Sequence, residues 1–290
     1  MSRLNRRYWK IKVSQPDGQF KEWSEIDFEG TVHKSIQKEP NKSEITIYNL
    51  NSDSRSYISQ DSMTLEIFAG YEPADLNGLL LRAEIDIITN TREGTEWKTK
   101  IIARDGAKTT RNAKIEKTFA AGTSNKSIMQ ALEKILTSAP VVKVSKREKK
   151  KPVKKTQVVP LKKGNINYSA VSGKLAKART LKGLAIDYYA EFCRSFGLRF
   201  QINDGTLHVV GSNFSILDDV IQLDSDSGLI GVPEKTETGW KFKSLLRFDI
   251  EPGQKIRVKS DALTADILMT DVSHNAKTQG DWLTEIEGKI

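Results

Sequence analysis

Alternation of apolar and polar residues marks the first hundred positions of the chain. Residues 9–13 (WKIKV) alternate with period two, as a half-buried strand does, and residues 16–18 (PDG) are typical of a hairpin turn. The same pattern predicts further strands at 27–36, 43–50, 63–71, 80–89 and 97–104. Six or seven short strands at this spacing favour an antiparallel barrel or sandwich over alternating βαβ units.

Helical spacing replaces this alternation in the middle of the chain. A short helix is expected at 52–58 between two strands, with Ser52 or Asp53 as its cap. After Phe119, apolar residues recur every three or four positions up to Leu136, which predicts a helix capped by Thr123 or Ser124 and stopped by Pro140. A second helix is expected at about 180–196, ended by Gly197.

The chain returns to β-structure after the second helix. Residues 198–202 and 206–210 alternate on either side of Asn203-Asp204-Gly205, a strong hairpin signal. Further strands are predicted at 227–232, 239–246, 255–260, 265–274 and 282–290. We therefore divide the chain into an N-terminal β region at 1–112, an α+β middle at 113–222 and a C-terminal β region at 223–290.

Composition narrows the class of protein. The 290 residues are 38% hydrophobic, enough for a substantial core, and no apolar run approaches the roughly 18 to 20 residues that cross a bilayer. The basic N-terminus is not followed by an apolar stretch, so no secretion signal or membrane attachment is expected. The single cysteine, Cys193, excludes an internal disulfide and suits assembly in a reducing cytoplasm.

The formal charge of +9 is concentrated in one segment. Residues 143–163 (KVSKREKKKPVKKTQVVPLKK) hold ten Lys or Arg and one acid, Glu148, and the remaining chain has 36 basic and 36 acidic residues. We interpret this segment as a solvated loop or arm that docks on a neighbouring protein. Its candidate contact residues are Lys146, Arg147, Lys149, Lys150, Lys151, Lys154 and Lys155. Direct contact with DNA is the alternative, through the backbone and without sequence preference, because aromatic residues that stack on bases are absent from the segment.

The sequence contains no residue pattern typical of a catalytic, nucleotide-binding or metal site. His33, His208 and His274 each fall in a predicted strand without metal-ligand spacing, and Cys193 lies on the apolar stripe of a helix. No glycine-rich nucleotide motif occurs, and the acidic stretch 224–227 lacks the spacing of a calcium loop. The sequence therefore predicts no catalytic, cofactor or metal site. A cell-wall hydrolase remains as an alternative, because paired carboxylates cannot be recognised from sequence alone.

Several stretches in order resemble phage tail hub proteins. Residues 41–50 (NKSEITIYNL), 63–71 (MTLEIFAGY) and 103–106 (ARDG) are similar to the family's N-terminal signature, and 197–207 (GLRFQINDGTL) to its hairpin. The C-terminal run is more distinctive, with SGLIGVP at 227–233, TGW at 238–240, EPG at 251–253 and DWLT at 281–284. The resemblance covers most of the chain except the basic segment, which looks like an insertion.

The resemblance implies a fold and a role. Such proteins form the central hub of contractile-tail baseplates and the base of type VI secretion spikes. It implies a mainly β fold with an α+β middle, in which two tube-like antiparallel β-barrel regions are joined by a helix and hairpin segment. It also implies a homotrimer in the virion, assembled in the host bacterial cytoplasm. The implied partners are a tail tube or tube-initiator protein, a central spike, wedge proteins and a tape-measure protein, with passing contact with DNA. The alternative is a nucleic-acid-binding module that uses 143–163.

Overall fold

The computed structural model describes residues 6–37, 40–61, 63–72, 76–138, 160–211, 215–216 and 219–290. Contacts divide the chain into two compact units. Unit 1 combines Met1–Asp105 with Asn213–Ile290, and unit 2 is Gly106–Ser212. Unit 2 is thus inserted into the sequence of unit 1. The chain is mainly β, as the sequence predicted.

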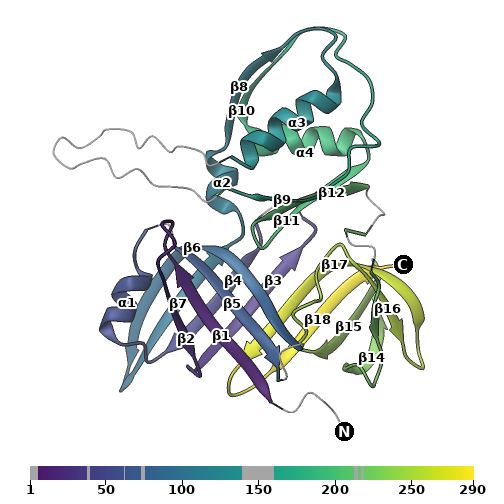
Figure 1. Cartoon of the computed structure of the whole chain (residues 1–290). Coiled ribbons are helices and arrows are strands. Elements are labelled where there is room, and N and C mark those ends of the chain that lie inside the picture. The colour runs from purple at the N-terminus through teal and green to yellow at the C-terminus, as the bar shows by residue number, and fades with distance from the viewer. Residues whose placement is uncertain are drawn as a thin grey trace, which may run out of the picture. The chain divides into compact units, whose positions relative to one another are not determined.

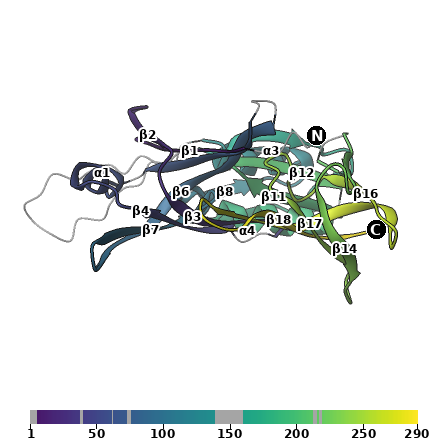
Figure 2. The same cartoon turned by 90° about the horizontal axis from the view of Figure 1, so that it is seen from below.

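Unit 1 is built on one large sheet from both ends of the chain (Figures 1 and 2). Its N-terminal elements are β1 (Arg7–Ser14), β2 (Phe20–Ser24), β3 (Phe28–Ser35), β4 (Lys42–Tyr48), α1 (Ser52–Ile58), β5 (Thr64–Tyr71), β6 (Asn77–Glu93) and β7 (Glu96–Arg104). Its C-terminal elements are β13 (Ile221–Leu223), β14 (Leu229–Lys235), β15 (Trp240–Leu245), β16 (Lys255–Lys259), β17 (Thr264–Lys277) and β18 (Trp282–Lys289).

The strand order of this sheet is β14-β15-β18-β17-β3-β4-β7-β6-β5-β1-β2, with β16 on β17 and β13 on β16. Antiparallel pairing of β3 with β17, in register from Glu29↔Lys277 to Ser35↔Asp271, joins the N-terminal strands to the C-terminal ones. Strands β2 and β14 end the path, and no pairing between described residues closes it. The mainly β prediction is confirmed, whereas the two closed barrels stay a prediction.

Two hydrophobic clusters fill unit 1. The first lies among β1–β7, and the second among β13–β18. Trp282 of β18 belongs to the first cluster, although it comes from the C-terminal part. Its ring packs edge-on against Trp9 and Phe28, at centroid distances of 6.2 and 6.3 Å, and its indole N–H donates to the Gly70 carbonyl at 3.2 Å. This side chain ties the two ends of the chain into one unit.

Unit 2 is an α+β unit with its own core. Its elements are α2 (Ala107–Asn112), β8 (Lys114–Phe119), α3 (Asn125–Leu136), β9 (Lys162–Ile166), β10 (Arg179–Leu184), α4 (Ala185–Ser195), β11 (Leu198–Asn203) and β12 (Thr206–Gly211). Strands β8 and β10 form a two-stranded ribbon, and β11-β12-β9 form a small sheet in which β9 and β12 run parallel. Helices α3 and α4 pack on each other.

Local signals in unit 2 identified α3, α4 and the β11–β12 hairpin, but not α2, β8, β9 or β10. Ser124 caps α3, its hydroxyl accepting from the Ser127 amide at 3.1 Å, and Asp204 and Gly205 both have positive φ in the β11–β12 turn. The second predicted helix was wrong at its start. It begins at Ala185, because residues 179–184 pair with β8 as strand β10 and bury Leu181 there.

The division of the chain into regions 1–112, 113–222 and 223–290 stays a prediction. The first and third regions keep separate hydrophobic clusters, but their strands share one sheet. The predicted cap of α1, Ser52 or Asp53, was wrong: Asn51 is the cap, and its side chain accepts from the Ser54 amide at 2.8 Å. No helix within the described residues is long and apolar enough to cross a bilayer.

Candidate interaction surface

The single cysteine sits in the core of unit 2. Cys193 on α4 is buried, and burial raises the pKa of its thiol to about 12. A thiol with so high a pKa is almost entirely protonated at neutral pH and is a poor nucleophile. The side chain therefore acts as a small apolar core residue, as its place on the helical stripe predicted.

The histidines occupy structural positions. His274 on β17 is fully buried, and its Nδ1 lies 2.9 Å from Thr284 Oγ1. Burial, reinforced by the nearby Lys34 ammonium, holds the pKa of His274 well below its usual value. His33 on β3 stands opposite Ser273, so its side chain and that of the neighbouring His274 face opposite sides of the sheet. In unit 2, burial lowers the pKa of His208, whose Nδ1 accepts from the Asn165 amide at 3.2 Å.

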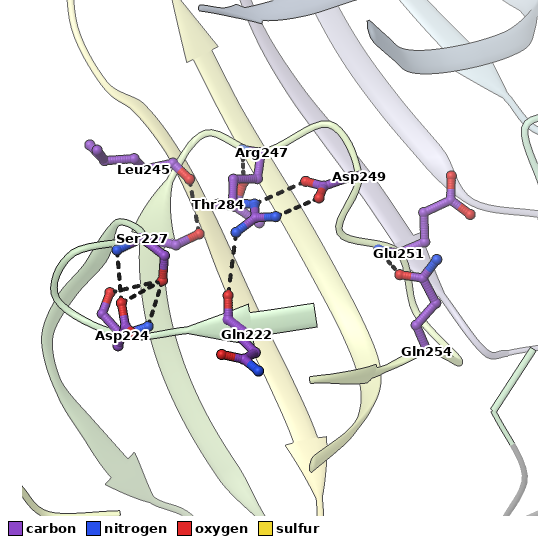
Figure 3. A network of polar contacts seen from close by, with 10 residues as sticks. Gln222, Asp224, Ser227, Leu245, Arg247, Asp249, Glu251, Gln254 and Thr284 are labelled. Atoms are coloured by element: carbon purple, nitrogen blue, oxygen red, sulfur yellow. Dashed lines mark hydrogen bonds and ion pairs between the residues drawn. The ribbon is translucent and has the colours of Figure 1, made fainter. Parts of the chain in front are cut away.

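The acidic stretch at 224–227 is a turn that orders its own backbone (Figure 3). Asp224 Oδ1 accepts from the amides of Asp226 and Ser227 at 3.1 and 2.9 Å and from the Ser227 hydroxyl at 2.8 Å. Hydrogen bonds from Ser227 are the main reason that the pKa of Asp224 is lowered. Across the described ranges, no group of three or more His, Cys, Asp or Glu is arranged to hold a metal ion. The turn instead fixes the start of β14.

An arginine bridges the strands behind this turn (Figure 3). The Arg247 guanidinium makes a two-point ion pair with Asp249, at 3.0 and 2.5 Å, and also donates to the Gln222 carbonyl of β13 at 3.5 Å. Its backbone amide donates to Thr284 Oγ1 of β18 at 3.2 Å. Because Thr284 also contacts His274, the network connects β13, β17, β18 and the loop after β15. These contacts cross-link the strands of the C-terminal part next to its outer strand.

That outer strand, β14, carries exposed apolar side chains. It pairs with β15 alone among the described strands, and the pairing is interrupted between Ile230 and Glu234. Ile230 is 42% exposed and Val232 is 64% exposed. Gly231, between them, has a φ of +72°, the left-handed region that favours glycine. An edge strand with free backbone groups and exposed β-branched residues is a template for a second chain.

The opposite end of the sheet also presents an apolar residue. Phe20 at the start of β2 is 53% exposed, and the Lys12 ammonium lies 4.5 Å from its ring centroid. Ile87 on β6, Val220 and Ile290 are the other large exposed apolar residues of the described chain, and all six belong to unit 1. We define two sheet-end surfaces, Phe20 at the β2 end and Ile230 with Val232 at the β14 end. They are the strongest candidates for protein contact.

The predicted interaction arm lies outside the described residues, which include none of Lys146, Arg147, Lys149, Lys150, Lys151, Lys154 and Lys155. Only the last part of the basic segment is described. Lys162 and Lys163 belong to strand β9, so this part is not a loop. Lys163 forms an ion pair with the buried Glu133 of α3 at 2.9 Å.

Sequence reasoning recognised β14 as a strand but not its place at the sheet edge. Alternation alone cannot reveal this, because an edge strand and a central strand share the same period. The run at 229–233 (LIGVP) did contain a usable signal. Pro233 lacks an amide N–H and is confined to edges or bulges, and β14 is in fact irregular there.

Comparison with known proteins gives a likeness of fold only. No protein-family model matches the chain, and no curated protein matches it in sequence. Among solved structures, it is similar to the prophage MuSo2 43 kDa tail protein from Shewanella oneidensis, with a TM-score of 0.62 and 8% identity over 96% of both chains.

Two further structures extend this likeness. A tail protein from Neisseria meningitidis MC58 has a TM-score of 0.62 and 10% identity, over 97% of this chain and 96% of that one. An E. coli component of the type VI secretion system, described as similar to the T4 tail proteins gp27 and gp5, has a TM-score of 0.57 and 13% identity. The match covers 91% of this chain and 73% of that protein.

Proposed function

We propose that this chain is a structural, non-enzymatic protein of a phage-type tail, the hub at the centre of a baseplate. Three copies form a ring that joins the tail tube above to the central spike below. The ring lines a channel for the tape-measure protein and the DNA. The observation that carries the proposal is the likeness of fold to two tail proteins over almost the whole length of both chains.

The construction of unit 1 supports a ring of three. Each chain supplies two β regions with separate hydrophobic clusters, so three chains present six related elements to a sixfold tube. The large sheet is open at two different ends, β2 and β14. Two different surfaces on one subunit suit head-to-tail contacts, which close into a ring when the rotation between subunits allows it.

The proposed partners follow from this role. Tube or tube-initiator, spike, wedge and tape-measure proteins would contact the ring in a virion tail baseplate assembled in the host cytoplasm. The two β regions would form the tube-like barrels of the ring. We assign the arm residues Lys146, Arg147, Lys149, Lys150, Lys151, Lys154 and Lys155 to contact with a neighbouring protein.

The first test is the mass of the purified protein in solution, by light scattering behind a sizing column. We expect a trimer near three times 32.6 kDa, with a ring visible in electron micrographs. A protein that is monomeric at every concentration, and stays so with a candidate spike protein added, contradicts the proposal.

The sheet-end surface on β14 gives a sharper test. Val232→Lys places a charge on the exposed edge strand and should weaken trimer formation by about tenfold or more, because loss of an interface hot spot costs about 2 kcal/mol or more of binding. Ile87→Lys, also exposed in unit 1 but on β6, is the matched control. Equal weakening by both variants would place the subunit contact elsewhere.

A further inference from the structure

Charge is divided unevenly between the two units. Unit 2 has 22 Lys or Arg and 6 Asp or Glu, a net charge of +16, whereas unit 1 has 24 and 31, a net charge of −7. The sum is the +9 of the whole chain. The neutrality of the chain outside residues 143–163 is therefore a cancellation between a basic unit and an acidic one. The expectation that basicity belongs to a single segment was wrong.

The described part of unit 2 is basic without residues 139–159. It holds 14 Lys or Arg and 5 Asp or Glu, a net charge of +9. Three of the five acids already have cationic partners within the unit: Glu116 with Lys182 at 2.7 Å, Glu133 with Lys163 at 2.9 Å and Glu191 with Arg179 at 2.8 Å. Little negative charge is left to balance the remaining cations.

Four of those cations lie on α3 or on the segment that follows the loop bonded to its start, and we call them the α3 track: Lys126, Lys134, Lys174 and Lys177. Lys126 and Lys134 are eight residues apart on the exposed side of α3, which separates them by about 12 Å along the helix. All four are exposed, and no ion pair joins any of them to a carboxylate in the ranges that the structure describes.

The loop that carries Lys174 is fixed to the start of α3. Asn125 donates from its backbone amide to the Gly173 carbonyl at 3.1 Å and from its side-chain amide to the Ser172 carbonyl at 2.8 Å. Backbone bonds between Leu175 and both Gly122 and Thr123, each 2.9 Å, hold the other side. These hydrogen bonds therefore hold the loop that carries Lys174 beside the start of α3.

The described surface of unit 2 lacks the usual anchor of a protein interface. Protein interfaces rely on buried apolar and aromatic residues at their centre. Every large exposed apolar residue of the described chain is in unit 1, and the described part of unit 2 contributes none. Nucleic-acid interfaces are instead polar and strongly positive. Unit 2 also exposes no fully accessible aromatic ring among its described residues on which unpaired bases could stack.

We propose that the α3 track binds the phosphate backbone of duplex DNA without sequence preference. Duplex DNA presents one negative charge per about 1.7 Å of its axis, so about 12 Å of track faces several phosphates. The lysines act as point charges that displace condensed counterions. This inference does not rest on the trimer, since every residue of the track belongs to one unit of one chain.

The test uses the full-length protein and a fluorescently labelled duplex of arbitrary sequence, with binding followed by anisotropy from low to moderate salt. The variant Lys126→Glu/Lys134→Glu should bind at least tenfold more weakly than the wild type. The slope of log K against log salt should become shallower by about 2, since each phosphate contact contributes about 0.9. A Lys126→Gln/Lys134→Gln variant removes the positive charges without adding negative ones, so it separates loss of the lysine contacts from repulsion between glutamate and DNA. Circular dichroism of each variant checks that its helices are still folded.

The matched control is Lys259→Glu/Lys289→Glu, which changes net charge equally on exposed lysines of unit 1. It should stay within about twofold of the wild type. Equal weakening by track and control variants would mean that only net charge matters and would overturn the proposal. Unchanged binding of the track variants would overturn it too. Competition by poly-glutamate as strong as that by unlabelled duplex would assign the track to an acidic protein instead.

Discussion

Unit 1 and unit 2 offer partners different chemistry. Unit 1 is slightly acidic, its outer faces carry paired charges such as Lys241 with Glu287 at 3.2 Å, and its exposed apolar residues include both ends of an open sheet. Unit 2 is strongly basic and, in its described part, exposes no large apolar side chain. Apolar edges suit stable protein contacts, whereas unbalanced lysines suit a polyanion and give contacts that weaken with salt. On the proposals made above, unit 2 would give the chain a second mode of recognition beside the apolar sheet ends of unit 1.

The two units can be observed separately in one sample. All five tryptophans, Trp9, Trp23, Trp97, Trp240 and Trp282, belong to unit 1. Their fluorescence therefore reports unit 1, while the longer helices α3 and α4 make circular dichroism at helical wavelengths report mainly unit 2.

The largest effect is expected at Trp282, where the two ends of the chain meet. Trp282→Ala should lower the free energy of unfolding of unit 1 by about 3–5 kcal/mol, because it removes a buried ring and leaves a cavity against Trp9 and Phe28. Urea unfolding followed by tryptophan fluorescence measures it. If the circular dichroism transition shifts by as much, the two units unfold together, which contradicts the expectation that they are separate units of stability.

The reciprocal change in unit 2 is Tyr168→Phe. The buried Tyr168 hydroxyl donates to Glu133 Oε2 at 2.7 Å and lies 2.7 Å from the Tyr189 hydroxyl, which can donate to it. Loss of a buried hydrogen bond to a charged group should destabilise unit 2 by about 1.5–3 kcal/mol. The loss should appear in the circular dichroism transition. Tyr188→Phe, whose hydroxyl bonds only to exposed backbone of Lys182, is the control and should lose less.

Acid should destabilise unit 1 through His274. Because burial keeps the folded side chain neutral, the unfolded chain takes up the proton below its ordinary pKa of about 6.5. More protons are then bound in the unfolded state, so stability falls as pH drops below about 6.5, by up to about 1.4 kcal/mol per pH unit. His274→Gln should remove this part of the dependence. Parallel stability curves for wild type and variant between pH 7 and 5 would contradict it.

The smallest effects come from one helix cap in each unit. Asn51→Ala removes the cap of α1 in unit 1, and Ser124→Ala removes that of α3 in unit 2. Each should cost about 1 kcal/mol. We expect the first variant to move only the fluorescence transition and the second only the helical one. Shifts in both signals for either variant would indicate one cooperative unit.

Local structure was largely predictable because its causes are local. Alternation identified β1, β3–β7 and β14–β18 but not β13, and Ser124 together with the Asp204-Gly205 turn marked a helix start and a hairpin. The start of α4 was missed because pairing of residues 179–184 with β8 depends on a strand 60 residues away. Pairing between distant strands overrides the short-range pattern.

The candidate surfaces were harder to foresee. The basic segment stood out in the sequence, but lysines 126 and 174 are 48 residues apart and meet only because the loop at 172–175 bonds to the start of α3. The net positive charge of unit 2 was not apparent from the sequence. When only residues 143–163 are left out of the count, the negative charge of unit 1 cancels the remaining positive charge of unit 2. Recognising it required the boundary between the units, which depends on the pairing of β3 with β17.

The pairing of β3 with β17 also determines how long β3 waits for its partner strand during synthesis. Strand β3 leaves the ribosome about 240 residues before β17, its partner in the register from Glu29↔Lys277 to Ser35↔Asp271. At about 5–20 residues per second this is a delay of roughly 12–48 s. During that interval unit 2 is complete and able to fold, while the edge of β3 has no neighbour on one side and is open to other chains. A strand made late in synthesis therefore covers the edge of one made early, and until then a chaperone or another chain can bind that edge of β3.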